Sequence, residues 1–171
     1  MSETLEIKLK EAGKIERLTN KTFQFEKELG EGLYSANYFL KSQKIVKENE
    51  PNHIVTMQWF QRREEAMLCG VDEAIALIHT FAIHPEELTI EAMNDGDIIK
   101  NMEPVLKVTG KYENFGFLES VIDGILARRT SVATNVREAL LAADGTPVFS
   151  MADRQDDYRT QIGDGYATYV A

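Results

Sequence analysis

The sequence has little of what disulfides, membrane spans and nucleic-acid surfaces require. Cys69 is its only cysteine, which excludes a disulfide within the chain. No apolar run approaches the ~20 residues that span a bilayer, and residues 1–10 lack the apolar core of a signal peptide. Lys and Arg number 19 against 28 Asp and Glu, a net charge of -9, so no nucleic-acid partner and no anionic membrane surface is expected. These features predict a cytoplasmic protein.

Histidines and glycines also lack the spacing of metal sites and phosphate loops. His53, His79 and His84 are scattered along the chain, so neither a metal site nor a catalytic triad is indicated. Residues 163–165 (GDG) have neither the longer glycine pattern nor the lysine of a phosphate loop. We predict a turn and helix cap there.

Apolar residues make up 43% of the chain, enough for a substantial core, and their periodicity changes along it. Alternation with period 2 predicts strands, a period of 3.6 predicts helices, and Asn-Asp-Gly-Asp at 94–97 indicates a tight turn. The expected elements are a helix over 35–47 capped by Ser35, a strand over 54–61, a helix from 72 to 81, and strands over 88–93 and 103–108.

The last third returns to helical periodicity over residues 117–143. Thr130 and Ser131 are interpreted as caps that divide this stretch into two helices. A cap there would put Arg128 and Arg129 near a helix N-terminus, where a phosphate binds readily, although a solvated helix face is the more common role. Residues 144–147 indicate a loop, 148–151 a short strand, and a further helix is expected to begin near Asp164.

This order of elements predicts an α+β protein followed by the opening of an α/β unit. We divide the chain into an N-terminal arm or weakly anchored helix over 1–28, an α+β domain over 29–145 that includes a helical pair, and an α/β segment over 146–171. The last segment is too short to bury its apolar faces alone, because closed α/β barrels need roughly 200 residues or more.

Several collinear segments resemble nicotinate phosphoribosyltransferases of the shorter microbial type, with coverage from about residue 23 to the end. They are residues 32–41 (GLYSANYFLK), 57–61 (MQWFQ), 68–73 (LCGVDE), 95–98 (DGDI), 103–106 (EPVL), 112–120 (YENFGFLES) and 125–134 (ILARRTSVAT). The resemblance implies the N-terminal α/β domain of a type II phosphoribosyltransferase, followed by the first strand and helix of an incomplete barrel.

The resemblance also implies a reaction. Enzymes of this family transfer the phosphoribosyl group of phosphoribosyl pyrophosphate to the ring nitrogen of nicotinate, giving nicotinate mononucleotide for NAD synthesis, with Mg2+ and coupled ATP hydrolysis. They assemble as homo-oligomers with shared active sites. The chain resembles only the N-terminal portion, so we expect little activity from it alone and assign no catalytic residue. The alternative is a non-enzymatic module that binds a pyridine or associates with a complete homologue.

Two residues match positions that meet the pyridine in similar enzymes. Arg154 follows the expected strand, and a guanidinium pairs well with a planar carboxylate; the alternative is an ion pair with a neighbouring aspartate. Tyr38 would stack on the pyridine; the alternative is a core aromatic on an amphipathic helix. The Ser35-Ala36 pair departs from the Thr-Asp usual before this ring.

Two further residues depart from the family pattern. Met151 lies where related enzymes often carry a second stacking aromatic, and a thioether can still pack on a ring, although an ordinary barrel-core residue is the simpler interpretation. Gln155 lies where many carry a histidine. We retain both as substrate-binding candidates beside Tyr38 and Arg154.

Overall fold

The structure, a computed structural model, describes residues 16–151 and 154–171. It is mixed α and β, as the periodicity predicts. In chain order the elements are η1 (Lys27–Glu31), α2 (Asn37–Asn49), β1 (Ile54–Trp59), β2 (Glu65–Met67), α3 (Val71–Phe81), η2 (Pro85–Glu87), β3 (Thr89–Ala92), β4 (Ile98–Lys100), β5 (Leu106–Lys111), α4 (Tyr112–Phe115), η3 (Gly116–Leu118), α5 (Glu119–Ala142) and α6 (Tyr158–Val170).

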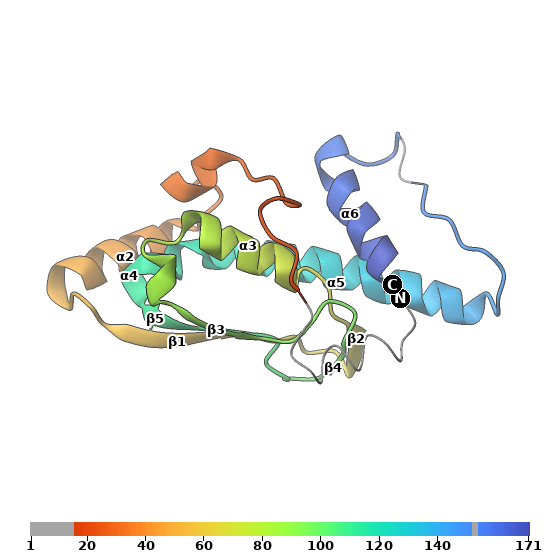
Figure 1. The fold of residues 1–171 in the computed structure, drawn as a ribbon, viewed down its shortest axis with the longest axis horizontal. Helices are drawn as coiled ribbons and strands as arrows, with labels where there is room; N and C mark the ends of the chain where they lie inside the picture. The colour runs from red at the N-terminus through yellow and green to blue at the C-terminus, as the bar shows by residue number, and fades with distance from the viewer. Residues whose placement is uncertain (1–15, 152–153) are drawn as a thin grey trace.

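Two small antiparallel sheets organise the described residues. The larger has the strand order β1-β5-β3, with Val108 of β5 opposite Met57 on one side and Ile90 on the other; β2 pairs with β4. Burial alternates strictly along β5, so Leu106 and Val108 face the core. Helices α2, α3 and α4 lie on one side of the larger sheet (Figure 1). The core forms between that sheet face and the helices.

The core contains residues that are far apart in the sequence. Its largest fully buried side chains come from the β2–α3 region, β4, β5 and the segment leading into α5. Burying each aliphatic or aromatic side chain contributes about 1.5–3 kcal/mol. They include Leu68, Val71, Leu77, Ile78, Ile99, Leu106, Val108, Phe115, Leu118 and Ile122.

Helix α6 packs on α5 mainly through polar contacts. Arg128 donates two hydrogen bonds to the Asp164 carboxylate of α6, at 3.1 and 2.7 Å, and Arg129 Nη1 lies 3.7 Å from the same carboxylate while its other nitrogens bond to Glu73 of α3. The Tyr166 hydroxyl donates to Asp95 Oδ2 at 2.7 Å. A small apolar cluster of Cys69, Ala133 and Ala167 lies beneath these contacts. The helix is therefore positioned by hydrogen bonds around a modest apolar contact.

Several sequence predictions are confirmed. The strand over 54–61 is present as β1, the helix over 72–81 as α3, and the strand over 88–93 as β3. The turn at 94–97 forms with Gly96 at φ 91°. The strand expected over 103–108 is displaced towards the C-terminus, to Leu106–Lys111.

The predicted break at Thr130 and Ser131 is wrong, because α5 runs unbroken from Glu119 to Ala142. The Thr130 hydroxyl accepts from Cys69 N at 3.2 Å and donates to Cys69 O at 3.1 Å. Thr134 Oγ1 accepts from Met67 N at 3.0 Å. These hydroxyls bond to a neighbouring segment of backbone instead of capping a helix. Arg128 and Arg129 consequently lie inside α5, and the phosphate site that depended on a helix end there is also wrong.

The expectations for the C-terminal third need two further corrections. Residues 148–151 form no strand and are exposed. Residues 163–165 lie inside α6, which begins at Tyr158 with the Asp157 carboxylate accepting from Arg159 N. A Cβ at Gly163 would lie 1.8 Å from Arg129 Cζ, so a larger residue there would displace the Arg129 guanidinium. The glycine permits close approach of α5 and α6, and is not a turn.

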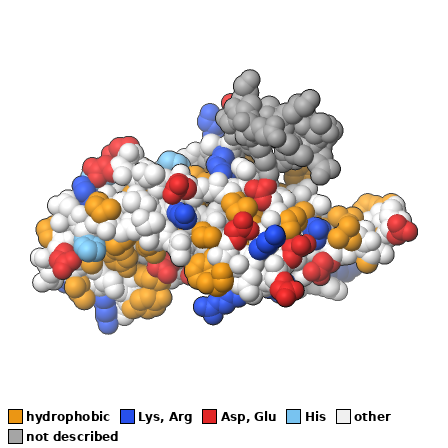
Figure 2. Space-filling view, turned by 90° about the horizontal axis from the view of Figure 1, so that it is seen from below, with side chains coloured by type: hydrophobic (Ala, Val, Ile, Leu, Met, Phe, Trp, Pro, Cys, Tyr) orange, Lys and Arg blue, Asp and Glu red, His pale blue; other side chains and the backbone are white. Residues whose placement is uncertain are grey.

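The N-terminal arm expected over 1–28 is only partly described, because residues 1–15 lie outside the described residues. From residue 16 the chain is anchored: Arg17 donates to Asp72 Oδ1 and to the Met93 carbonyl, both at 2.7 Å. Within the described ranges, no helix combines the length and apolar character needed to cross a bilayer. Acidic and basic side chains are interspersed along the face shown in Figure 2.

Replacing Tyr166 by Phe is expected to loosen α6 and to lower the free energy of unfolding by about 2 kcal/mol, because the half-buried Asp95 carboxylate loses a hydrogen-bond donor. The change deletes the 2.7 Å bond to Asp95. Urea unfolding measures the change in the free energy of unfolding. Tyr169→Phe is the matched control, since Tyr169 lies on the same helix and is 87% exposed. An equal loss in both variants would contradict this role for Tyr166.

Candidate functional site

Tyr38 lies in the first turn of α2 with its ring 62% exposed. The ring centroid lies 4.0 Å from that of Phe39, at an interplanar angle of 41°. Phe39 is the buried member of the pair, at 7% exposure, so the alternative that placed Tyr38 in the core is wrong. One side of the Tyr38 ring is therefore supported by a fixed aromatic neighbour, while much of the ring meets solvent.

The backbone before Tyr38 is fixed to the start of α5. Ser35 Oγ donates to the Phe117 carbonyl at 2.6 Å, and Ala36 N donates to Ser120 Oγ at 3.1 Å. Ser35 was expected to cap α2, but Ala36 occupies the N-cap position and no side chain caps the helix. The Ser35 hydroxyl instead joins two segments 82 residues apart. These bonds position the exposed ring.

Met151, Arg154 and Gln155 all lie in the connection between α5 and α6. Met151 is 81% exposed, and Arg154 and Gln155 are exposed in a turn before α6. Tyr38 belongs to a different part of the chain. The candidate residues thus form two exposed groups, one on α2 and one before α6.

A hollow of about 950 Å3 lies between α5 and the ends of β1 and β2. Trp59, Leu126 and Thr130 contribute to its wall, together with the carboxylates of Glu119 and Asp123. Burial raises the pKa of Asp123, opposed by a hydrogen bond from Trp59; burial and then the Asp123 charge raise the pKa of Glu119. Arg62 and Arg63 also line this hollow, so its wall carries charges of both signs.

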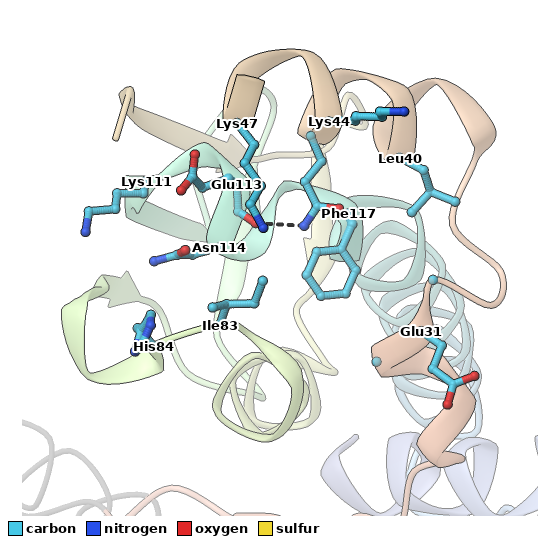
Figure 3. A pocket seen from close by; sticks show the side chains of 13 residues that line it. Glu31, Leu40, Lys44, Lys47, Ile83, His84, Lys111, Glu113, Asn114 and Phe117 are labelled. Carbon is cyan, nitrogen blue, oxygen red and sulfur yellow. Dashed lines mark hydrogen bonds between the residues drawn. The ribbon is translucent and has the colours of Figure 1, made fainter. Parts of the chain in front are cut away.

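A second hollow of about 580 Å3 lies between α2, α4 and the loop after α3 (Figure 3). Lys47, Lys111, Glu113 and Asn114 are among its lining residues. No sequence pattern pointed to this hollow, although it contains part of the 112–120 motif. A polar Glu-Asn pair between the aromatic residues of that motif is the signal that could have indicated it.

Metal-ligating side chains do not gather in the described part of the chain. Over residues 16–151 and 154–171, no group of three or more His, Cys, Asp or Glu side chains is placed to hold a metal ion. The one thiol, Cys69, is fully buried, and burial raises its pKa, so it is held as a neutral thiol.

Comparison with known proteins identifies relatives. Residues 34–130, more than half of the chain, match the family described as quinolinate phosphoribosyl transferase, N-terminal domain. No curated protein sequence matches. Among solved structures, nicotinate-nucleotide pyrophosphorylase from Pyrococcus furiosus has a TM-score of 0.75 at 24% identity and is covered over 39% of its length by 91% of this chain. Human nicotinic acid phosphoribosyltransferase has a TM-score of 0.66 at 16% identity, with coverage of 33% of its length and 77% of this chain.

The nicotinate-nucleotide pyrophosphorylase from Ehrlichia chaffeensis is also similar, with a TM-score of 0.60 at 17% identity over 86% of this chain and 53% of its own. The chain spans about two fifths of the Pyrococcus protein and a third of the human one. The predicted α+β fold of a type II phosphoribosyltransferase N-terminal domain is confirmed. These matches do not distinguish the nicotinate branch from the quinolinate branch. The chain belongs to the quinolinate phosphoribosyl transferase N-terminal domain family.

Proposed function

We propose that this chain forms the N-terminal domain of an enzyme that joins a phosphoribosyl group to a pyridine carboxylate in NAD biosynthesis. The family match over residues 34–130 is the observation that carries this proposal. The matched range includes Tyr38 and both hydrogen bonds that position it. The reaction requires a pyridine held with its ring nitrogen directed at the anomeric carbon, and the geometry around Tyr38 suits the holding of a flat ring.

Tyr38 is proposed to stack on the pyridine. An aromatic side chain supplies a large, flat contact with few rotatable bonds, and aromatic pairs add about 0.5–1.5 kcal/mol beyond their buried area. Phe39 supports the ring at 4.0 Å, and the exposed fraction of 62% leaves room for a ligand. Because the ring is exposed, a second surface is needed to enclose the pyridine.

Arg154 is proposed to pair with the pyridine carboxylate, with Met151 and Gln155 as neighbouring contacts. Arginine is the only cation among the four candidate residues, and one guanidinium matches one carboxylate. One arginine does not separate nicotinate from quinolinate, which carries two carboxylates, so the proposal of nicotinate rests on the resemblance of residues 34–41 and 112–120 to that branch. The human neighbour is a nicotinic acid phosphoribosyltransferase, whereas the matched family model is described as quinolinate phosphoribosyl transferase.

In the proposed reaction the ring nitrogen donates its electron pair to the anomeric carbon of phosphoribosyl pyrophosphate. The bond to pyrophosphate breaks, and pyrophosphate leaves with that bonding pair. Tyr38 and Arg154 would act by positioning the pyridine, which lowers the entropic part of the barrier. Mg2+ and ATP belong to the proposal for the complete enzyme, but the described residues do not provide a metal cluster, and no step is assigned to them here.

A homo-oligomer and a cytoplasmic location complete the proposal. Four large side chains near the C-terminal end of the chain are more than 80% exposed. Burying them against a partner would be favourable, because their apolar area would leave water. They are Phe149, Met151, Ile162 and Tyr169. A second copy of the chain, or a following barrel, would cover them and could enclose the pyridine at Tyr38.

Replacing Tyr38 by Leu is expected to raise KM for nicotinate about fivefold in a protein that carries this chain together with an α/β barrel, because stacking is lost. Formation of nicotinate mononucleotide from nicotinate, phosphoribosyl pyrophosphate and ATP is measured. Tyr38→Phe is the control, since it keeps the stacking ring and is expected to leave KM within about twofold. Failure of the unaltered protein to form the product would overturn the proposed activity; nicotinate binding without turnover would favour a non-enzymatic pyridine-binding module.

Replacing Arg154 by Ala is expected to weaken nicotinate binding at least about tenfold, because a charge-assisted hydrogen bond to the carboxylate is removed. Isothermal titration of the chain with nicotinate, and separately with quinolinate, measures the effect. Arg159→Ala is the matched control, because it removes the same charge five positions away at the exposed start of α6. Equal affinities for the two variants would remove Arg154 from the site, and tighter binding of quinolinate would reassign the substrate.

A further inference from the structure

Tyr34 has a backbone conformation that tyrosine rarely adopts. Its φ is 66°, in the left-handed region, where the Cβ of a bulky residue crowds the following carbonyl oxygen. Four other non-glycine residues in the described part of the chain also have positive φ: Asn52, His84, Met102 and Asp144. Asparagine, histidine and aspartate are the types that tolerate this region best. Tyr34 and Met102 are therefore the two exceptions among the described residues.

Tyr34 lies in the third position of a four-residue turn. Ser35 N donates to Gly32 O at 3.0 Å and closes the turn over residues 32–35. Turns that require positive φ at the third position usually have glycine or asparagine there. The turn would form with less strain if asparagine replaced Tyr34, so the turn itself does not explain the tyrosine.

The fold does not explain the tyrosine either. Tyr34 is 65% exposed, so little of its ring is buried against the core. Its hydroxyl makes no hydrogen bond with any residue in the described ranges. Strained residues that the surrounding structure does not reward are concentrated at ligand-binding sites. The strain at Tyr34 therefore points to a contact outside the chain.

The segment that carries Tyr34 also carries Tyr38, and it is anchored on both sides of the turn. Before the turn, the residue preceding Tyr34 donates from its backbone N to Glu28 O at 3.1 Å; after it, Ser35 Oγ donates to Phe117 O at 2.6 Å. Because Tyr38 is four positions further along, the two tyrosine Cα atoms lie at most about 14 Å apart. Both exposed rings can therefore reach one ligand from a fixed backbone.

We propose that Tyr34 is a second contact for the pyridine, with its ring packed against the edge of a pyridine that stacks on Tyr38. Edge-to-face contact is one of the two arrangements that aromatic rings prefer. The inference rests on the proposed function and adds a residue to which the resemblance gives no role. The contact selects for an aromatic ring, so Tyr34 distinguishes a pyridine carboxylate from a saturated ring of the same charge.

Isothermal titration of the Tyr34→Asn chain tests the inference, with nicotinate and cyclohexanecarboxylate as probes. Cyclohexanecarboxylate has the same charge and no aromatic ring. The variant is expected to bind nicotinate about fivefold more weakly, because one aromatic pair is lost, and to bind cyclohexanecarboxylate as the unaltered chain does. Its urea unfolding midpoint is expected to be no lower than that of the unaltered chain, because asparagine tolerates the left-handed conformation. Weaker binding by an equally stable protein separates a ligand contact from a folding defect.

Met102→Asn is the matched control, because Met102 has φ 61° and is 53% exposed. It lies between β4 and β5, and β4 is far from α2 (Figure 1). This change relieves the same kind of strain and is expected to leave the affinity for nicotinate within about twofold, as for a surface substitution.

Three results would overturn the role of Tyr34 and leave the proposed function intact. They are an unchanged affinity of Tyr34→Asn for nicotinate, an equal loss of affinity for both probes, and a lower urea unfolding midpoint for this variant. Absence of nicotinate binding by the unaltered chain would overturn the inference together with the pyridine-binding role proposed for Tyr38.

Discussion

The carboxylate of Asp95 holds together parts of the chain that are distant in sequence. It accepts from Val71 N at the start of α3, at 2.8 Å, and from the Tyr166 hydroxyl of α6, at 2.7 Å. Burial raises the pKa of Asp95, and these hydrogen bonds act against that shift by stabilising the charged form. The turn that carries Asp95 is closed by Gly96 N donating to Leu68 O at 2.7 Å. Asp95 and the turn that carries it thus connect the smaller sheet, α3 and α6 through hydrogen bonds.

The sequence predicts the elements whose partners are local and misses those determined by distant contacts. Alternation identifies β1, and an apolar stripe identifies α3, because each pattern reports a face buried by that element alone. Thr130 looks like a cap from its neighbours, yet its hydroxyl bonds to Cys69, 61 residues away. Gly163 looks like a turn residue, yet it is small because Arg129 of another helix crosses it. Neither partner can be inferred from periodicity.

In the candidate site, too, some features follow from the local sequence and others depend on distant contacts. Tyr38 was selected by resemblance, and its exposure and its support by Phe39 are consistent with a ring-stacking role. The bonds that position it come from Phe117 and Ser120, which no local pattern around Tyr38 predicts. Met151, Arg154 and Gln155 follow α5 in an exposed connection, where side-chain direction depends on what packs against them. Sequence identified the residue types, whereas tertiary contacts determine their geometry.

Buried polar groups in this protein fall into two classes with different consequences. Thr134 and Asp164 are buried and Asp95 is half-buried; all three are hydrogen-bonded, and each joins one element to another. Glu113 and Asn114 each leave a buried polar atom unpaired beside a hollow. A buried polar group that is satisfied contributes to specifying the fold, whereas one that is not satisfied costs stability unless something else completes it. Because Gln43 and Ile83 hydrogen-bond to the carbonyls of Glu113 and Asn114, the backbone of α4 is fixed from two sides, and packing of the surrounding elements offsets the cost of the two unpaired atoms.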